Sequence, residues 1–320
     1  MDELIRVDGL STHYFTREGV VRAVDNVSLK IRRGEAVALV GESGSGKSTA
    51  AFSIMRLISR PGRIVGGTVM LDGQDLLALG DSEISRIRGG KLSMVFQEPT
   101  TFLNPLIRVG EQIAEAVRIH HGIRRSEARD LAIETLRQVQ LPNPETIADY
   151  FPHQLSGGMK QRILIAIAIA CRPSLLIADE PTTALDVTVQ AQIMHLLCSL
   201  CRDLGTALLL ITHNLGLVAE YCERVYVMYA GQIVEEAGIF DLFSSPQHPY
   251  SEALLDCALM FDRRVDDFKT IDGRPPSRVN VPPGCRFHPR CTKVMSDCSV
   301  VSPPVVDLEN AGQVRCLLHC

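Results

Sequence analysis

A glycine-rich segment near the start of the chain constrains the fold most. Gly41–Ser48 reads G-E-S-G-S-G-K-S and fits the phosphate-loop pattern G-x-x-x-x-G-K-S/T. It follows a β-branched run, Ala36–Val40, and precedes a segment that we expect to be helical from Lys47 to about Leu57. A strand, a glycine-rich turn and a helix in this order form a cradle of backbone N–H groups for phosphate. The sequence therefore predicts an α/β domain that binds a nucleotide.

The residues of this loop have separable roles. Glycines let the backbone close around the phosphates, Lys47 reaches the β- and γ-phosphate oxygens, and the Ser48 hydroxyl can ligate Mg²⁺. We expect the nucleotide to contact Gly41, Ser43, Gly44, Ser45, Gly46, Lys47, Ser48 and Thr49.

A second motif downstream supplies acidic groups. Leu175–Asp179 is a short apolar run that ends in Asp179, and Glu180 follows directly. Acidic residues at strand ends are usually exposed to solvent and have no catalytic role. Downstream of a phosphate loop, however, such residues can take part in nucleotide hydrolysis. Asp179 would hold Mg²⁺, and Glu180 would polarise the water that attacks the γ-phosphate.

The remaining pattern predicts how the elements are grouped. Residues 4–30 alternate apolar and polar positions around a turn, which is typical of antiparallel strands. Residues of about 101–160 lose strand character and predict an inserted helical subdomain. The apolar runs at 175–179 and 206–212 predict strands separated by a helix. We expect an α/β fold with a mainly parallel core sheet and an N-terminal antiparallel β-subdomain.

The last part of the chain has a different amino-acid composition. Beyond about residue 261 it is rich in Pro, Arg and Cys and shows little periodicity. We expect a nucleotide-binding domain over residues 1–260 and a small Cys-rich C-terminal module over 261–320, joined near 262–272. The first residues carry acids rather than a secretory signal, which favours the cytosol, where clustered cysteines indicate metal ligands more than disulfides.

Charge and hydropathy limit the partners. The net charge of −4 offers no basic field for nucleic acid. The longest apolar run, Ile163–Cys171, belongs to an expected buried helix that starts at Gly157. It is far short of the roughly 18 residues that a membrane span needs. A role at a membrane would therefore require a membrane-embedded partner.

Leu155–Arg162 reads L-S-G-G-M-K-Q-R and resembles the LSGGQ signature of ATP-binding cassette proteins, with Met159 in the usual Gln position. Companion segments agree with this family in order and spacing over about residues 1–260. The family's Q-loop, D-loop, switch histidine and adenine-stacking residue are resembled by Gln97, Asp186, His213 and Tyr14 respectively. Phe15 is the alternative to Tyr14 as the aromatic residue that stacks on adenine.

The resemblance implies a shared ATP site. In this family two cassettes close head to tail, so each ATP lies between one phosphate loop and the partner's signature. Ser156, Gly157 and Gly158 would begin a helix whose N-terminus binds the γ-phosphate held by the other subunit. One cassette per chain implies a related second subunit, with a homodimer as the alternative. The implied catalytic residues are Glu180, His213 and Gln97, and the implied Mg²⁺ ligands are Ser48, Gln97 and Asp179.

One branch of the family is a closer match. Residues 96–106 and 247–255 look like segments of the ATPase subunits of oligopeptide and dipeptide importers. In the Pro-rich tail, four cysteines resemble the motif that binds a 4Fe–4S cluster in this branch, and zinc and free thiols are the alternatives. These cysteines are Cys285, Cys291, Cys298 and Cys316.

The resemblance predicts an ATP-hydrolysing importer subunit on the cytoplasmic face of the membrane. Two membrane permeases and, indirectly, an external solute-binding protein would be its partners, with residues 97–105 beside the permeases. The cargo would be peptides, or alternatively nickel, an oligosaccharide or another small solute. A soluble cassette ATPase and a redox-sensing regulator are rival functions from other classes.

Overall fold

The computed structural model describes residues 2–183, 185–259, 271–308 and 312–320. Two compact units make up the fold. The first unit comprises Met1–Leu4, Arg32–Glu35 and Ala78–Leu210, and the second comprises Ile5–Ile31, Ala36–Leu77 and Ile211–Cys320. The predicted joint at 262–272 falls mostly outside the described residues. In the described part of the chain, no helix has the length and apolarity that crossing a bilayer requires.

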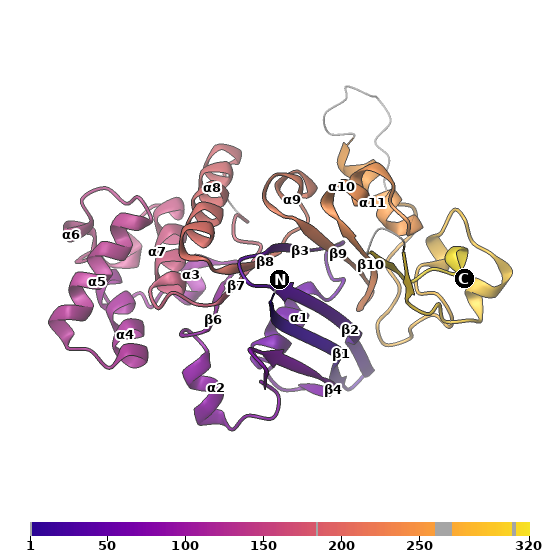
Figure 1. The fold of residues 1–320 in the computed structure, drawn as a ribbon, viewed down its shortest axis with the longest axis horizontal. Coiled ribbons are helices and arrows are strands. Elements are labelled where there is room, and N and C mark those ends of the chain that lie inside the picture. The colour runs from indigo at the N-terminus through magenta and orange to yellow at the C-terminus, as the bar shows by residue number, and fades with distance from the viewer. Residues whose placement is uncertain (1, 184, 260–270, 309–311) are drawn as a thin grey trace. The chain divides into compact units, whose positions relative to one another are not determined.

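An antiparallel sheet forms one part of the second unit (Figure 1). Its strand order is β2-β1-β4-β5, and β1 pairs antiparallel with β4. Apolar side chains such as Ile5 and Val7 alternate with polar ones along β1 and are fully buried. The predicted antiparallel strands are therefore confirmed. The strands are β1 (Glu3–Thr16), β2 (Gly19–Arg32), β4 (Gly62–Leu71) and β5 (Gln74–Asp75).

A mixed sheet forms the other part of the second unit, in the order β11-β12-β10-β9-β3. β3 is parallel to β9, whereas β9, β10, β12 and β11 pair antiparallel in turn. The Cys-rich tail therefore adds two short strands to this sheet. The strands are β3 (Ala36–Val40), β9 (Arg224–Tyr229), β10 (Gln232–Gly238), β11 (Val306–Asp307) and β12 (Gln313–Val314).

In the described part of the second unit, four helices and several short turns complete the fold. α9 packs on β3 and on α11, and α10 packs on β10. α1 ends earlier than the predicted Leu57, because Arg56 takes a left-handed conformation with φ 53°. The helices are α1 (Lys47–Ile54), α9 (Leu215–Tyr221), α10 (Ile239–Ser244) and α11 (Pro249–Leu259), with 3₁₀ turns at His288–Arg290, Ser296–Ser299 and Leu317–His319.

The first unit joins three strands to the predicted helical subdomain. Its strands lie in the order β8-β7-β6, and β6 is parallel to β7. α4 and α5 pack together and on α7, which contacts β6 and α8 (Figure 1). The elements are α2 (Asp81–Ile87), β6 (Leu92–Val95), α3 (Pro99–Phe102), α4 (Val109–His121), α5 (Arg125–Gln138), α6 (Pro144–Ile147), a 3₁₀ turn (Pro152–Gln154), α7 (Gly157–Ile169), β7 (Leu175–Asp179), α8 (Val187–Leu204) and β8 (Ala207–Ile211).

Buried apolar residues explain the two main helices of this unit. α4 buries Val109, Ile113 and Val117, which repeat every four residues and form one apolar face. α7 is apolar on most of its surface and buries Ile163 and Ile165 completely. α7 is thus the buried core helix that its sequence predicts.

Candidate functional site

The phosphate loop lies in the second unit between β3 and α1, where the sequence predicts it. Gly41 and Gly46 have φ angles of 151° and 113°, and Gly46 is the N-cap of α1. A Cβ atom at Gly41 would lie 2.1 Å from the carbonyl oxygen of Met228, and one at Gly46 would lie 2.3 Å from that of Ala23. Only glycine fits at these two positions. The neighbouring strands β9 and β2 therefore set how closely the loop can pack.

Polar groups of the loop are arranged to receive an anion. The ammonium group of Lys47 folds back and donates hydrogen bonds to the carbonyl oxygens of Gly41 (2.8 Å) and Glu42 (3.1 Å). The hydroxyl of Ser45 is buried and has no hydrogen-bond partner among the described residues. A buried ammonium group and an unpartnered hydroxyl inside a ring of glycines suit phosphate oxygens. The other predicted ligands in the same turn and at the start of α1 are Ser43, Gly44, Ser48 and Thr49.

Residues of the C-terminal region form hydrogen bonds with Glu42, which lies inside the loop. The Arg290 guanidinium donates to both carboxylate oxygens of Glu42, at 2.7 and 3.0 Å, and the Glu42 N–H donates to the Tyr250 hydroxyl at 2.8 Å. The pairing with Glu42 raises the pKa of Arg290, so the guanidinium stays charged. No local sequence pattern predicts these contacts, because Arg290 is 248 positions away from Glu42.

The predicted adenine-stacking residue and the switch histidine also belong to the second unit. Tyr14 pairs with Gly62 across β1 and β4, and a Cβ atom at Gly62 would lie 2.7 Å from the Tyr14 ring. Arg63 lies over the ring of Phe15, 5.6 Å from its centroid. His213 is exposed in the turn that follows β8. The roles assigned to Tyr14 and His213 stay predictions.

Three of the predicted residues come together in the first unit. Asp179 is buried at the end of β7, and Glu180 follows it with a left-handed backbone, φ 45°. The Gln97 side-chain amide donates to Oε2 of Glu180 at 3.2 Å. The Thr183 hydroxyl donates to the same oxygen at 3.0 Å, a contact that the sequence analysis missed. These donors orient the Glu180 carboxylate, as a residue that positions a water molecule requires.

The signature segment begins a helix, as predicted. Ser156 is the N-cap of α7, and its hydroxyl accepts a hydrogen bond from the Met159 N–H at 3.4 Å. Gly157 and Gly158 form the first turn, where free N–H groups and the helix dipole favour an anion. Asp186 caps α8 by accepting from the Val189 N–H at 3.0 Å. Ala184, in the predicted D-loop, lies outside the described residues.

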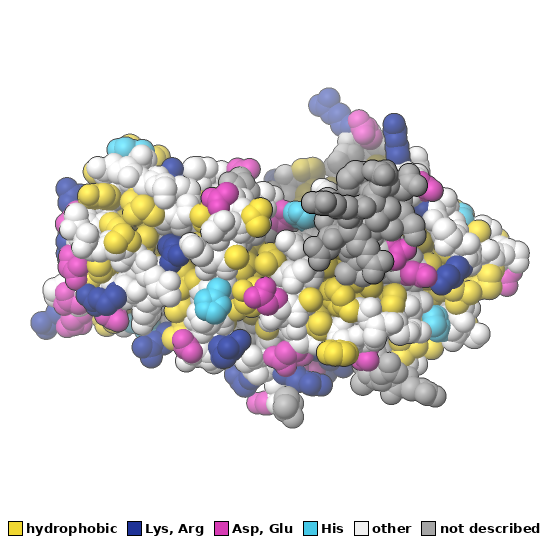
Figure 2. All heavy atoms as spheres, turned by 90° about the horizontal axis from the view of Figure 1, so that it is seen from above, with side chains coloured by type: hydrophobic (Ala, Val, Ile, Leu, Met, Phe, Trp, Pro, Cys, Tyr) yellow, Lys and Arg dark blue, Asp and Glu magenta, His cyan; other side chains and the backbone are white. Residues whose placement is uncertain are grey.

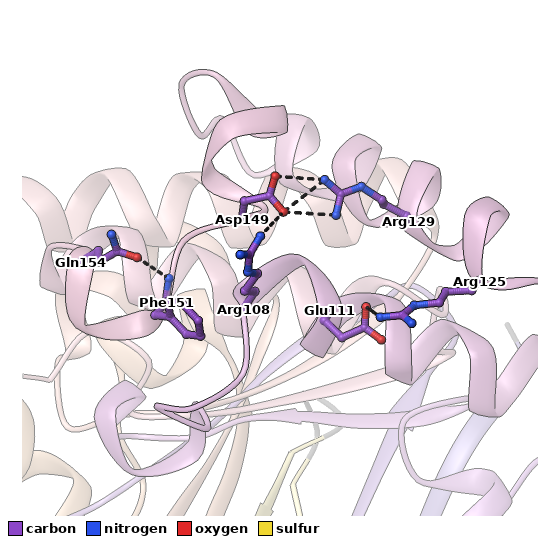
Figure 3. Close-up of polar contacts among 7 residues, drawn as sticks. All are labelled: Arg108, Glu111, Arg125, Arg129, Asp149, Phe151 and Gln154. Atoms are coloured by element: carbon purple, nitrogen blue, oxygen red, sulfur yellow. Dashed lines mark hydrogen bonds and ion pairs between the residues drawn. The ribbon is translucent and has the colours of Figure 1, made fainter.

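A network of ion pairs ties the helices of the first unit together. Asp149 lies between Arg108 and Arg129, with contacts of 3.1 Å to each, and Arg125 pairs with Glu111 at 3.2 Å (Figure 3). Figure 2 shows acidic and basic side chains interspersed over the end of this unit that α4–α6 form. The side chains of Asp149, Arg108 and Arg129 are about half exposed to solvent, so water weakens the ion pairs.

We expect Asp149→Asn to lower the free energy of unfolding at pH 7 by less than about 1 kcal/mol, the usual range for exposed pairs. Hydrogen bonding to Arg129 and Arg108 lowers the pKa of Asp149 from 3.8, so its stabilisation is present above pH 3.8 and is lost as the pH falls below it. Urea unfolding at pH 7 and pH 3 measures this difference. Glu115→Gln, at an exposed position of α4, is the control, and an equal loss in both variants would contradict the pairing.

Four cysteines of the C-terminal region line one small cavity in the second unit. They are Cys285, Cys291, Cys298 and Cys316. The Cys285 N–H donates to the Cys298 carbonyl oxygen at 2.8 Å, and burial raises the pKa of the Cys285 thiol to about 11. Within the described residues, no three His, Cys, Asp or Glu side chains come close enough to hold a single metal ion. The thiols therefore surround a space and do not converge on one point.

His248 lines the same cavity and is 1% exposed. Its Nδ1 accepts a hydrogen bond from the Tyr250 N–H at 3.0 Å, and burial lowers its pKa to about 3. The neutral ring therefore carries its hydrogen on Nε2, which has no partner among the described residues. An unpaired N–H beside four thiols fits a cavity that holds a group able to accept a hydrogen bond.

Comparisons with known proteins place this geometry in a family. A family model described as "ABC transporter" matches residues 24–183, and one described as "Oligopeptide/dipeptide transporter, C-terminal region" matches residues 234–298. The chain is 48% identical to the oligopeptide transport ATP-binding protein AppD of Bacillus subtilis (strain 168), over 100% of this chain and 98% of AppD. The chain belongs to the ABC transporter family. It is also 45% identical to the dipeptide transport ATP-binding protein DppD of Escherichia coli (strain K12), over 98% and 96% of the two chains.

Solved ABC structures share the fold. The dimeric post-hydrolysis state of the ATP-binding cassette MJ0796, bound to ADP and Pi, has a TM-score of 0.67 and 32% identity. It covers 74% of this chain and 99% of its own. The structure of cbiO1 from Clostridium perfringens, part of the ABC transporter complex cbiONQ, has a TM-score of 0.64 and 25% identity, over 77% and 92% of the chains. The ABC fold predicted from the sequence is confirmed.

Proposed function

We propose that this chain is the ATP-hydrolysing subunit of an importer for oligopeptides or dipeptides. The observation that carries the proposal is the similarity over the whole chain to two subunits named for peptide transport, AppD and DppD. The match of residues 234–298 to the oligopeptide/dipeptide C-terminal region supports it, because this part lies largely beyond the cassette that all ABC proteins share.

Each predicted site residue has its own part in the chemistry. Backbone N–H groups of the phosphate loop and Lys47 bind the β- and γ-phosphates. Glu180, oriented by Gln97 and Thr183, accepts a proton from the attacking water. His213 contacts the γ-phosphate. Ser48, Gln97 and Asp179 would hold Mg²⁺, which neutralises charge on the phosphates.

A second ABC subunit completes each ATP site. The amide groups at the start of α7, with the Ser156 hydroxyl, bind the γ-phosphate of the ATP held by the partner. ATP therefore stabilises the closed pair, and hydrolysis releases it. We favour a related second subunit over a second copy of this chain. Two permeases in the membrane would hold the pair at the cytoplasmic face, with residues 97–105 beside them and an external binding protein that delivers the peptide.

Affinity purification of the tagged chain from detergent-solubilised native membranes tests this function. We expect two polytopic permeases and a second ABC subunit to co-purify, and peptides to stimulate ATP hydrolysis in the assembly with its binding protein. Recovery of ribosomal or DNA-repair proteins without a membrane protein would overturn the importer. Stimulation by nickel or an oligosaccharide, and not by peptides, would overturn the cargo.

We also propose that Cys285, Cys291, Cys298 and Cys316 hold a 4Fe–4S cluster. Four thiols around one cavity and the unpaired Nε2 hydrogen of His248 support this assignment. A single zinc ion needs four sulfur ligands that converge at about 2.3 Å, which these thiols do not do among the described residues. The cavity between them has a volume of about 10 Å³, so the thiols would have to move apart to ligate the irons of a cluster. The cluster would cross-link a Pro-rich segment that has little core of its own.

We expect the chain purified without oxygen to contain about four iron and four sulfide per molecule, the composition of the cluster, with visible absorption. Cys298→Ser should remove most of this iron. The matched control is Cys201→Ser, since Cys201 is a buried thiol of α8 in the first unit. Elemental analysis decides the outcome, and bound zinc with no iron, or equal iron in both variants, would overturn the cluster.

A further inference from the structure

The segment that precedes the four cysteines lies against the second unit's antiparallel sheet. The Arg22 N–H, in β2, donates to the carbonyl oxygen of Arg278 at 3.1 Å. A Cβ atom at Gly19, where β2 begins, would lie 2.7 Å from Cγ1 of Val279. These two contacts place the backbone of Arg278 and Val279 beside β2.

The Arg278 guanidinium touches the phosphate loop. A Cβ atom at Gly44 would lie 2.9 Å from Nη2 of Arg278, so the guanidinium occupies the space directly beside this glycine. The charge of Tyr14, the predicted adenine-stacking residue, also influences the pKa of Arg278, which places the two side chains near each other. Arg278 thus lies near both the phosphate-binding and the base-binding parts of the predicted nucleotide site.

Among the described residues the Arg278 guanidinium has no acidic partner, in contrast to two neighbouring arginines. Arg286 pairs with Asp25, and Arg290 pairs with both oxygens of Glu42. Within the described part of the chain, Arg278 forms no ion pair and its side chain donates no hydrogen bond. Burial lowers the pKa of Arg278, which marks a partly desolvated charge. A desolvated, unpaired guanidinium is costly unless an anion meets it.

We propose that Arg278 is a nucleotide ligand supplied by the C-terminal region, and that its guanidinium donates hydrogen bonds to a phosphate of the ATP held in the phosphate loop. The planar fork of an arginine side chain matches two phosphate oxygens at once. ATP then bridges the loop and the segment that leads to Cys285. By linkage, ATP binding strengthens the docking of this segment, and the docked segment strengthens ATP binding.

The affinity of the full-length chain for a fluorescent ATP analogue tests the proposal. We expect Arg278→Ala to weaken binding about tenfold or more, the effect of losing charge-assisted hydrogen bonds. Arg278→Lys keeps the charge and should lose less. Arg274→Ala, an exposed arginine of the same segment, is the matched control and should bind as the unmodified chain does.

Two results would overturn the proposal. One is unchanged or tighter ATP binding by Arg278→Ala; tighter binding would show that the side chain obstructs the nucleotide site. The other is an equal loss of affinity for adenosine, measured by competition, which would assign the contact to the base or ribose. The unfolding temperature without nucleotide shows whether Arg278→Ala has a folding defect. If it does, the ATP affinity of Arg278→Lys tests the proposal instead. The assay involves no transported solute, so it is independent of the proposed peptide import.

Discussion

Glu180→Gln is expected to bind ATP and to hydrolyse it at least about 100-fold more slowly than the unmodified chain, as the loss of a positioned base predicts. The Glu180 carboxylate accepts hydrogen bonds from Gln97 and Thr183, so its position is set by neighbours that the substitution leaves in place. A glutamine side chain fills the same volume but cannot take a proton from water.

Steady-state phosphate release and ATP affinity, measured on the same preparation, separate the two effects. Glu115→Gln is the control, because Glu115 is an exposed residue of α4. If Glu180→Gln turned over at a near-normal rate, Glu180 would not be the base. If it failed to bind ATP, the loss of hydrolysis would report on binding and not on catalysis.

Gly46→Ala should weaken ATP binding by roughly 100-fold, from backbone strain and overlap of about 3 kcal/mol. Gly46 has a φ of 113°, and the added methyl group would lie 2.3 Å from the Ala23 carbonyl oxygen. Because the clash is with backbone, either the loop or β2 must move. The N–H groups that begin α1 would then no longer point at the phosphates.

Gly66→Ala is the matched control for this prediction. Gly66 is in β4, and a Cβ atom there would meet nothing within 4 Å. We expect this variant to bind ATP normally. Calorimetric titration with ATP, together with an unfolding curve for each variant, checks the pair of results. Equal affinities in Gly46→Ala and Gly66→Ala would contradict the role of the loop conformation.

Local patterns predicted most of the elements that carry the nucleotide chemistry. A β-branched run, a glycine-rich turn and a helix are determined within about twenty residues, so their order predicts the phosphate loop directly. Helix ends were less accurate. α1 stops at Ile54 and not near Leu57, and α7 stops at Ile169 and not at Cys171, because Arg56 and Arg172 take left-handed conformations that periodicity does not reveal.

The composition of the sequence does not reveal how the Cys-rich tail joins the rest of the fold. The sequence predicts a small Cys-rich module beyond about residue 261, and in the structure β12 of this region pairs with β10 at Glu235 and Glu236. Two-residue strands have too few positions to show a period of two. Their pairing depends on the backbone N–H and C=O groups along the edge of β10, and this edge exists only in the folded sheet.

The sequence by itself determined the phosphate loop, the acidic strand end, the signature helix and the set of four cysteines, since each is encoded by neighbouring residues or by a recognisable motif. Only the tertiary structure decided what surrounds them. Arg290 pairs with Glu42, Arg278 reaches Gly44, and His248, whose Nε2 has no partner among the described residues, lines the cysteine cavity. These contacts join residues far apart in the chain, and burial and charge pairing select them only when the chain has folded.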